Sequence, residues 1–110
     1  MIFEQFDTVV VPFPFIDKPE TKKRPALVLS NEDFNQHGHT ILAMITTKRH
    51  PSWPGDSEIS EYAAAGLRLL CLVRFKLFTL DNRLILLKIG HLTKTDSLQI
   101  KKNFHRYLNI

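Results

Sequence analysis

The sequence contains little cysteine and little glycine, two residue types on which many functional sites depend. Its single cysteine, Cys71, cannot form an intramolecular disulfide and leaves no Cys-x-x-Cys pair for a structural zinc site. The four glycines, at positions 38, 55, 66 and 90, are scattered, so there is no glycine-rich phosphate-binding loop. Because Cys71 stands within an apolar run, residues 69–73, we expect a buried thiol and not a nucleophile.

Long apolar runs and a targeting signal are absent as well. No run approaches the about 18 residues that span a membrane, and residues 1–7 carry Glu4 and Asp7 without a basic start. With the lone cysteine, these absences predict a cytoplasmic chain with no membrane contact. A chain of 110 residues that is 44% hydrophobic and 24% charged predicts one folded domain, residues 1–110. The net charge of +4 is compatible with an anionic partner but does not identify one.

Short apolar runs rich in β-branched residues, separated by proline, glycine and polar residues, dominate the chain. They predict strands at residues 7–13, 24–30, 40–46, 69–77 and 83–89, a short strand at 57–60 and a helical turn within 31–38. The 40–46 strand is nearly all apolar, which favours a central position in the sheet.

The tail of the chain predicts a helix. Residues 93–96 (TKTD) fit a capping box. Four apolar residues then recur at helical spacing and are expected to pack against the sheet: Ile100, Phe104, Tyr107 and Leu108. The whole pattern predicts a mainly β fold, a small and partly open β-barrel of about six to seven strands with this helix against it.

Two polar side chains stand at the ends of apolar strands. Arg24 opens the second strand, where Pro25 holds it in an extended conformation, and Thr46 closes the third. If these strands are adjacent and antiparallel, Arg24 and Thr46 are neighbours. A guanidinium can bind phosphate oxygens bidentately, and a hydroxyl beside it donates one more hydrogen bond. An ordinary strand-end threonine beside a solvated cationic face is the alternative that the residues leave open.

Other residues near this pair suit contact with a nucleic acid. Those in the adjoining loops and strand ends are Lys22, Lys23, Thr47, Lys48 and Arg49. Their cations would follow a phosphate backbone and make affinity salt-dependent. Phe15 and Trp53 are candidates for stacking on unpaired bases, with core or loop packing as the alternative. No general base is evident, because Glu20 and His37 are candidates by position alone.

Six segments, in this order, resemble a known family: FDTVVVPFPF at 6–15, KRPALVLS at 23–30, AMITT at 43–47, AGL at 65–67, KLFTLD at 76–81 and KIGHL at 88–92. The chain is similar to the MazF/PemK toxins of type II toxin–antitoxin systems. The resemblance implies an SH3-like barrel of the CcdB/MazF type that works as a homodimer. It also implies a cognate antitoxin that occupies the RNA groove, and an endoribonuclease that cuts single-stranded RNA, typically mRNA, at short sequences without a metal or other cofactor.

In the family, the arginine of the Arg-Pro motif and the first threonine after the third strand form the catalytic pair, which here are Arg24 and Thr46. Cleavage without a metal would use the RNA 2′-hydroxyl as nucleophile and leave 2′,3′-cyclic phosphate and 5′-hydroxyl ends. Because a guanidinium stays protonated, Arg24 suits charge stabilisation better than proton abstraction.

Two alternative functions remain beside that of a nuclease. One is a toxin of the same fold that poisons DNA gyrase by protein contact, and the other is a degenerate family member that binds RNA or antitoxin without cutting RNA. The chain departs from the family at Phe6-Asp7, where Gly-Asp is common, and at Cys71, where serine is frequent.

Overall fold

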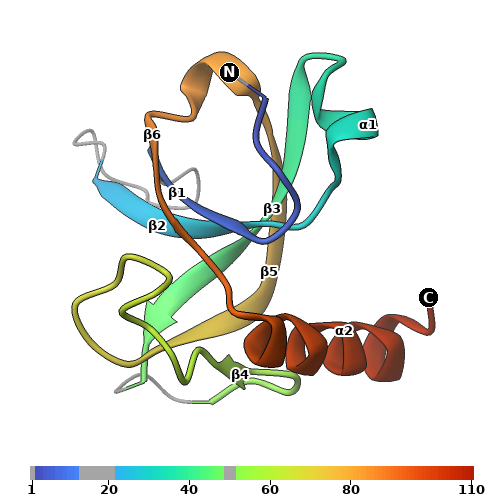
Figure 1. Cartoon of the computed structure of the whole chain (residues 1–110). Helices are drawn as coiled ribbons and strands as arrows, with labels where there is room; N and C mark the ends of the chain where they lie inside the picture. The colour runs from blue at the N-terminus through green and yellow to red at the C-terminus, as the bar shows by residue number, and fades with distance from the viewer. Residues whose placement is uncertain (1, 13–21, 49–51) are drawn as a thin grey trace.

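The computed structural model describes residues 2–12, 22–48 and 52–110. Six antiparallel strands form one sheet in the order β4-β5-β3-β2-β1-β6, curled into a half-barrel with helix α2 across one end (Figure 1). The strands are β1 (Asp7–Pro12), β2 (Lys23–Val28), β3 (His39–Thr47), β4 (Ser57–Glu58), β5 (Cys71–Asp81) and β6 (Leu87–His91). The helices are α1 (Glu32–Asn35), the 3-10 turn η1 (Asn82–Leu84) and α2 (Lys94–Leu108). The predicted mainly β, partly open barrel with a C-terminal helix is confirmed.

The predicted strand boundaries agree with the structure to within two residues in the first half of the chain and deviate by up to four residues in the second. Strand β3 lies inside the sheet, between β5 and β2, as expected. The predictions of strands at 69–77 and 83–89 are wrong at their ends, because β5 runs to Asp81 and β6 begins only at Leu87. Strand β5 pairs with β3 from His39↔Asp81 to Thr47↔Cys71, with a bulge at residues 75–76 where the register shifts between Ala43 and Met44. Tertiary pairing therefore keeps Thr79 and Asp81, which read as turn residues, inside a strand.

The core divides into two clusters because side chains alternate between the faces of the sheet. On β2, Leu27 belongs to the cluster that packs under α2, whereas its neighbours Ala26 and Val28 belong to the other cluster. Strand β3 alternates in the same way, with Ala43 on the helix side and Leu42 on the opposite side. This alternation fixes which side chains at the strand ends share a face.

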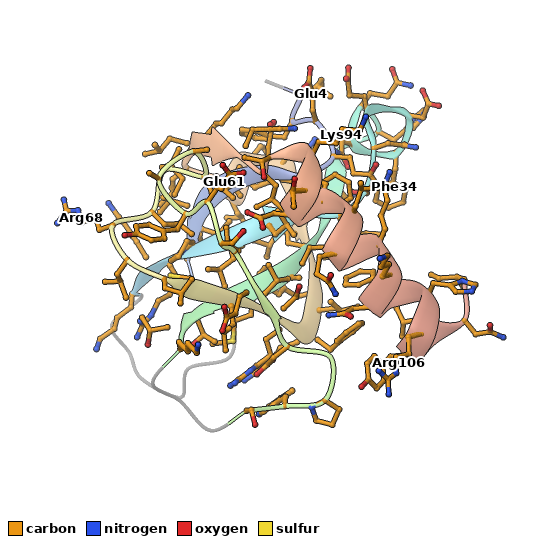
Figure 2. All side chains as sticks on the ribbon, turned by 60° about the horizontal axis from the view of Figure 1, so that its bottom comes forward. Glu4, Phe34, Glu61, Arg68, Lys94 and Arg106 are labelled. Carbon is orange, nitrogen blue, oxygen red and sulfur yellow. The ribbon has the colours of Figure 1, made fainter. Side chains whose placement is uncertain are left out.

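Helix α2 is capped as predicted, but it uses only part of its predicted apolar face. Thr93 accepts a hydrogen bond from the Asp96 backbone N–H at 3.3 Å, whereas the Asp96 carboxylate is bound by the Ser60–Glu61 segment instead of the cap. Ile100 is buried and Phe104 packs on the core. Tyr107 and Leu108 also face the sheet but remain 46% and 41% exposed; the Tyr107 ring packs edge-on against Phe75 of β5, with 5.8 Å between centroids. Figure 2 shows α2 crossing the sheet from Lys94 to Arg106.

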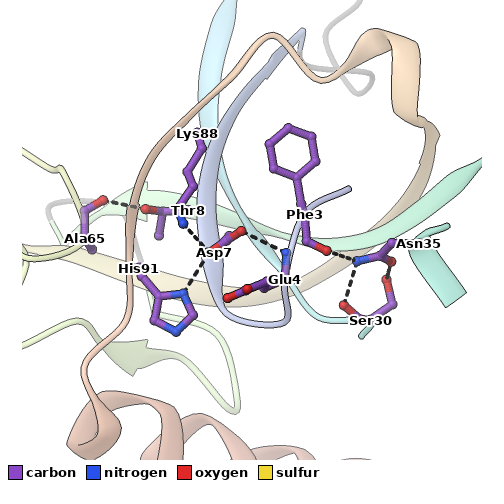
Figure 3. Close-up of polar contacts among 9 residues, drawn as sticks. All are labelled: Phe3, Glu4, Asp7, Thr8, Ser30, Asn35, Ala65, Lys88 and His91. Atoms are coloured by element: carbon purple, nitrogen blue, oxygen red, sulfur yellow. Dashed lines mark hydrogen bonds and ion pairs between the residues drawn. The ribbon is translucent and has the colours of Figure 1, made fainter. Parts of the chain in front are cut away.

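The start of β1 is joined to β6 by a buried carboxylate (Figure 3). Asp7 is 2% exposed; its Oδ1 lies 2.7 Å from His91 Nδ1 and 3.2 Å from Lys88 Nζ, and its Oδ2 accepts from the Glu4 backbone N–H. The preceding Phe6 has a φ of +71°, the left-handed region that favours glycine. The family's usual Gly-Asp at this point is thus explained by a conformation that Phe6 retains at some cost in strain.

Candidate functional site

Arg24 lies where the sequence places it, at the start of β2. It pairs with Val11 of β1 and shares a face with Ala26 and Val28. Its side chain is exposed, and no hydrogen bond or ion pair within the described residues involves it. Because Pro25 follows, its backbone is extended and its charge is held at the strand end. An exposed guanidinium on a fixed backbone is available for an anionic ligand.

Thr46 lies at the end of β3, on the same face of the sheet as Arg24. Strands β2 and β3 are adjacent and antiparallel, as predicted, with Ala26 opposite Met44 as the last pair of their ladder. The same register extended by two residues places Arg24 opposite Thr46. The ladder stops short of that pair, and in Figure 1 the start of β2 and the end of β3 diverge. The two residues therefore stand two positions beyond the last ladder pair, where the strand ends part; we call this point the Arg24–Thr46 opening.

Thr46 is 8% exposed, and its hydroxyl has no partner among the described residues. Thr47 differs, because alternation turns its side chain to the opposite face, where its hydroxyl is buried without a partner. Lys22, Lys23 and Lys48 are exposed. Arg49, like Phe15 and Glu20, lies outside the described residues.

Glu58 is a residue near this pair that sequence reasoning missed. It pairs with Leu72 of β5, which pairs with Thr46, so the three side chains share one face across three strands. Its carboxylate lies 2.5 Å from Lys48 Nζ, with the two side chains 47% and 58% exposed. The only sequence signal was its position in the short predicted strand at 57–60. His37, by contrast, precedes β3 and lies at the opposite end of that strand from Thr46.

A buried ion pair adjoins the site and fixes the segment that follows it. Arg74 of β5 donates from Nε to Asp56 Oδ1 at 3.1 Å and from Nη2 to Asp56 Oδ2 at 2.9 Å. Both side chains are 8% exposed. The Arg74 guanidinium also lies 5.0 Å from the centroid of the Trp53 ring. Neither Arg74 nor Asp56 was singled out from the sequence, because a charge in a strand and a charge in a loop do not reveal their pairing.

Within the described residues, one cluster has the ligand types of a metal site. Glu4, Asp7 and His91 offer atoms that lie within 4.8 Å of one another. The Lys88 ammonium already neutralises the Asp7 carboxylate. The cluster is also four residues along β1 from Val11, the partner of Arg24, a separation of about 13 Å. It is therefore separate from the Arg24–Thr46 opening.

The lone thiol behaves as the sequence predicts. Cys71 is 6% exposed, and burial raises its pKa above the ordinary value. A raised pKa keeps the thiol protonated and unreactive near neutral pH. Among the described residues, no helix has the length and apolarity that crossing a membrane requires.

A curled antiparallel sheet closed by one C-terminal helix, with an arginine and a threonine at facing strand ends, defines the class of fold. A family model described as "PemK-like, MazF-like toxin of type II toxin-antitoxin system" matches residues 4–108. The chain belongs to this family. No curated protein matches it significantly.

Solved structures agree with the family assignment at the level of fold. MazF from Deinococcus radiodurans superposes with a TM-score of 0.77 at 18% identity, covering 100% of this chain and 99% of that one. An endoribonuclease in complex with its cognate antitoxin from a mycobacterial species gives 0.76 at 15% identity, covering 99% and 95%. The Mycobacterium tuberculosis toxin MazF-mt6 gives 0.75 at 18% identity, covering 94% and 97%.

Proposed function

We propose that this chain is the toxin of a type II toxin–antitoxin pair and acts as an endoribonuclease on single-stranded RNA, typically mRNA. The observation that carries the proposal is the placement of Arg24 and Thr46 on one face at facing strand ends, each with no partner among the described residues. Family membership supports it, because endoribonuclease activity is typical of these toxins. A cellular RNA substrate places the activity in the cytoplasm.

In the proposed reaction the 2′-hydroxyl attacks the adjacent phosphorus. The P–O5′ bond breaks as the departing 5′ oxygen takes up a proton from solvent water, and the products are a 2′,3′-cyclic phosphate and a 5′-hydroxyl end. Arg24 binds the non-bridging oxygens, and Thr46 donates a further hydrogen bond as negative charge builds on them. The reaction needs no metal or cofactor, because the RNA supplies the nucleophile and Arg24 the positive charge.

The cleavage also requires a group that accepts the 2′-hydroxyl proton. Glu58 is a carboxylate on the same face as Thr46, and a protein base is normally a carboxylate or a histidine. We assign it this role in preference to His37, which is at the other end of β3.

RNA binding is assigned to the residues that flank the opening. Lys22, Lys23 and Lys48 are exposed cations, and Arg49 continues the same segment. Thr47 is included in the proposed RNA-binding set only because it lies at the strand end beside Thr46. Its hydroxyl is buried on the opposite face of the sheet. Binding mainly through cations predicts affinity that falls as salt rises.

Two protein partners belong to the proposal, a second copy of this chain and a cognate antitoxin. A groove of about 570 Å³ lies between the sheet and α2, and its lining includes Ile41, Leu77, Phe104, Leu108 and Ile110. Leu77, Leu108 and Ile110 are 37%, 41% and 83% exposed, an apolar surface that a homodimer would cover. The antitoxin is proposed because relatives of the same fold were solved with theirs.

The test is cleavage of single-stranded RNA in the presence of a chelator, followed by mapping of the ends. We expect cleavage with cyclic phosphate and 5′-hydroxyl termini, and Arg24→Ala should reduce its rate roughly 100- to 1,000-fold, as loss of one transition-state donor does elsewhere. Arg83→Ala, at an exposed arginine on η1, is the control and should cut like the parent.

Undiminished cleavage by the Arg24→Ala variant would show that the site is wrongly assigned. Cleavage that stops with the chelator would contradict the metal-free mechanism. If the parent inhibits DNA gyrase and leaves RNA intact, the protein-contact alternative is the better account.

A further inference from the structure

Trp53, the only tryptophan of the chain, is held in place although it lies in a loop. Its backbone N–H donates to Asp56 Oδ2 at 2.8 Å, and its carbonyl accepts from the Asp56 N–H at 3.1 Å, which closes a tight turn. Asp56 is in turn bound to Arg74 through two hydrogen bonds, and the Arg74 guanidinium lies over the indole. One buried ion pair therefore fixes both the backbone and the ring of Trp53.

The ring is held but not buried. Trp53 is 43% exposed, whereas the Arg74 and Asp56 side chains beneath it are 8% exposed. A guanidinium 5.0 Å from the centroid covers one face of the ring and leaves much of the indole open to solvent. The 43% of its surface that Trp53 leaves in water contributes nothing to packing, so stability alone does not account for holding an indole at this exposed position.

The position of Arg74 places the support of this ring on the same face of the sheet as Thr46. Strand β5 pairs Leu72 with Thr46 and Arg74 with Met44, without interruption between the two pairs. Arg74 and Thr46 are therefore diagonal neighbours on one face, about 7–8 Å apart.

We propose that Trp53 is a nucleobase-stacking platform of the RNA site, positioned by the Arg74–Asp56 pair. This inference rests on the proposed ribonuclease function and adds a residue that holds a base of the bound strand on the Thr46 face of the sheet. Every base has a π-face, so stacking on the indole adds affinity with little sequence preference. The guanidinium below the ring favours the stack further, because a cation on one face polarises the ring toward it.

Because Trp53 is the only tryptophan, its fluorescence reports on this site alone. The experiment titrates the protein with a mixed-sequence 2′-O-methyl oligonucleotide, which cannot be cleaved. The control is an abasic oligonucleotide of equal length and charge. We expect the base-bearing strand to quench Trp53 emission and the abasic strand to bind, as measured by anisotropy of a terminal dye, without quenching.

Substitution gives the second readout. Trp53→Ala should weaken binding of the base-bearing strand roughly 5- to 150-fold, the range found when a stacking aromatic is removed. Binding of the abasic strand should be unchanged, and Trp53→Phe, which keeps a ring, should recover most of the loss. A merely structural role for Trp53 would change both strands equally.

The outcomes separate this inference from the function on which it rests. If the parent cuts RNA while Trp53 emission stays constant on binding, the platform is wrong and the nuclease assignment stands. Equal quenching by the abasic strand also overturns the platform. A parent that neither binds nor cuts RNA overturns both proposals.

Discussion

Replacing Arg74 with methionine should destabilise the protein far more than the same replacement at Arg83. The two arginines make nearly identical bidentate ion pairs. Arg74 contacts Asp56 at 3.1 and 2.9 Å, and Arg83 contacts Asp81 at 3.0 and 2.8 Å. They differ in burial, because the first pair is 8% exposed on both sides, whereas the Arg83 side chain is 89% exposed. The geometry of the ion pair is therefore the same in both, and Arg74 differs in its burial and in its contact with Trp53.

The expected loss of stability follows from the Asp56 carboxylate, which Arg74→Met leaves buried without its positive partner. Removing one partner of a buried ion pair costs about 3–5 kcal/mol, because the other charge remains without compensation. A domain of 110 residues has an unfolding entropy of about 0.23 kcal/mol/K, so this cost lowers the Tm by about 13–22 °C. The Trp53 N–H still binds Asp56, which favours the lower end of that range. Arg83→Met breaks a solvated pair and should leave the Tm close to that of the parent.

Thermal unfolding followed by circular dichroism at pH 7 measures both shifts. A double variant, Arg74→Met with Asp56→Asn, should recover part of the loss because it removes the stranded carboxylate. Equal Tm shifts for Arg74→Met and Arg83→Met would refute the argument that burial decides the strength of this pair. So would a double variant less stable than Arg74→Met alone.

Three further predictions concern the proposed base, the dimer and the thiol. Glu58→Gln should lower kcat, change KM little and flatten the acidic limb of the pH–rate profile; an unchanged profile would remove Glu58 from the mechanism. Leu77→Glu places a charge in the groove and should convert the proposed dimer into monomers, as measured by light scattering. Leu84→Glu, at an exposed leucine on η1, is the control and should leave the dimer intact; loss of the dimer in both variants would point to another interface. Because burial raises its pKa, the Cys71 thiol should react slowly with a disulfide reagent in the native protein and rapidly in guanidinium; fast native reaction would contradict its burial.

Sequence patterns predicted strands and helices well where the local preference of the residues agrees with their pairing in the folded sheet. The 40–46 run is apolar because both faces of β3 are buried, with Leu42 in one core cluster and Ala43 in the other. The TKTD segment starts α2 at Lys94. The second half of the sheet was misread because Thr79 and Asp81 are polar yet paired with β3. Asp81 does mark a turn, but as the cap of η1, accepting from the Arg83 N–H, at the last residue of β5.

Other features depend on contacts between segments that are far apart in the sequence, and local sequence patterns do not reveal such contacts. Gly66 has a φ of +76°, and a Cβ there would lie 2.0 Å from the Ile89 carbonyl oxygen. That glycine is required by a loop that passes over β6, and its turn signal gave no hint of the contact. The pairing of Arg74 with Asp56, eighteen residues apart, was invisible for the same reason. The positioning of Trp53 could therefore be inferred only once β5 and the preceding loop were placed together.

The candidate site combines a part that the sequence predicts with a part that only the fold supplies. Antiparallel β2 and β3 were enough to bring Arg24 toward Thr46. The opening between them has its cause in Pro25, which lacks a backbone N–H and adjoins Ala26, the last β2 residue in the ladder with β3. A ladder that continued to Arg24 would pair the two strand ends and leave less room between the two side chains. The proline that fixes the backbone of Arg24 thus also favours the end of the ladder, so one residue accounts for both features on which the proposed phosphate site depends.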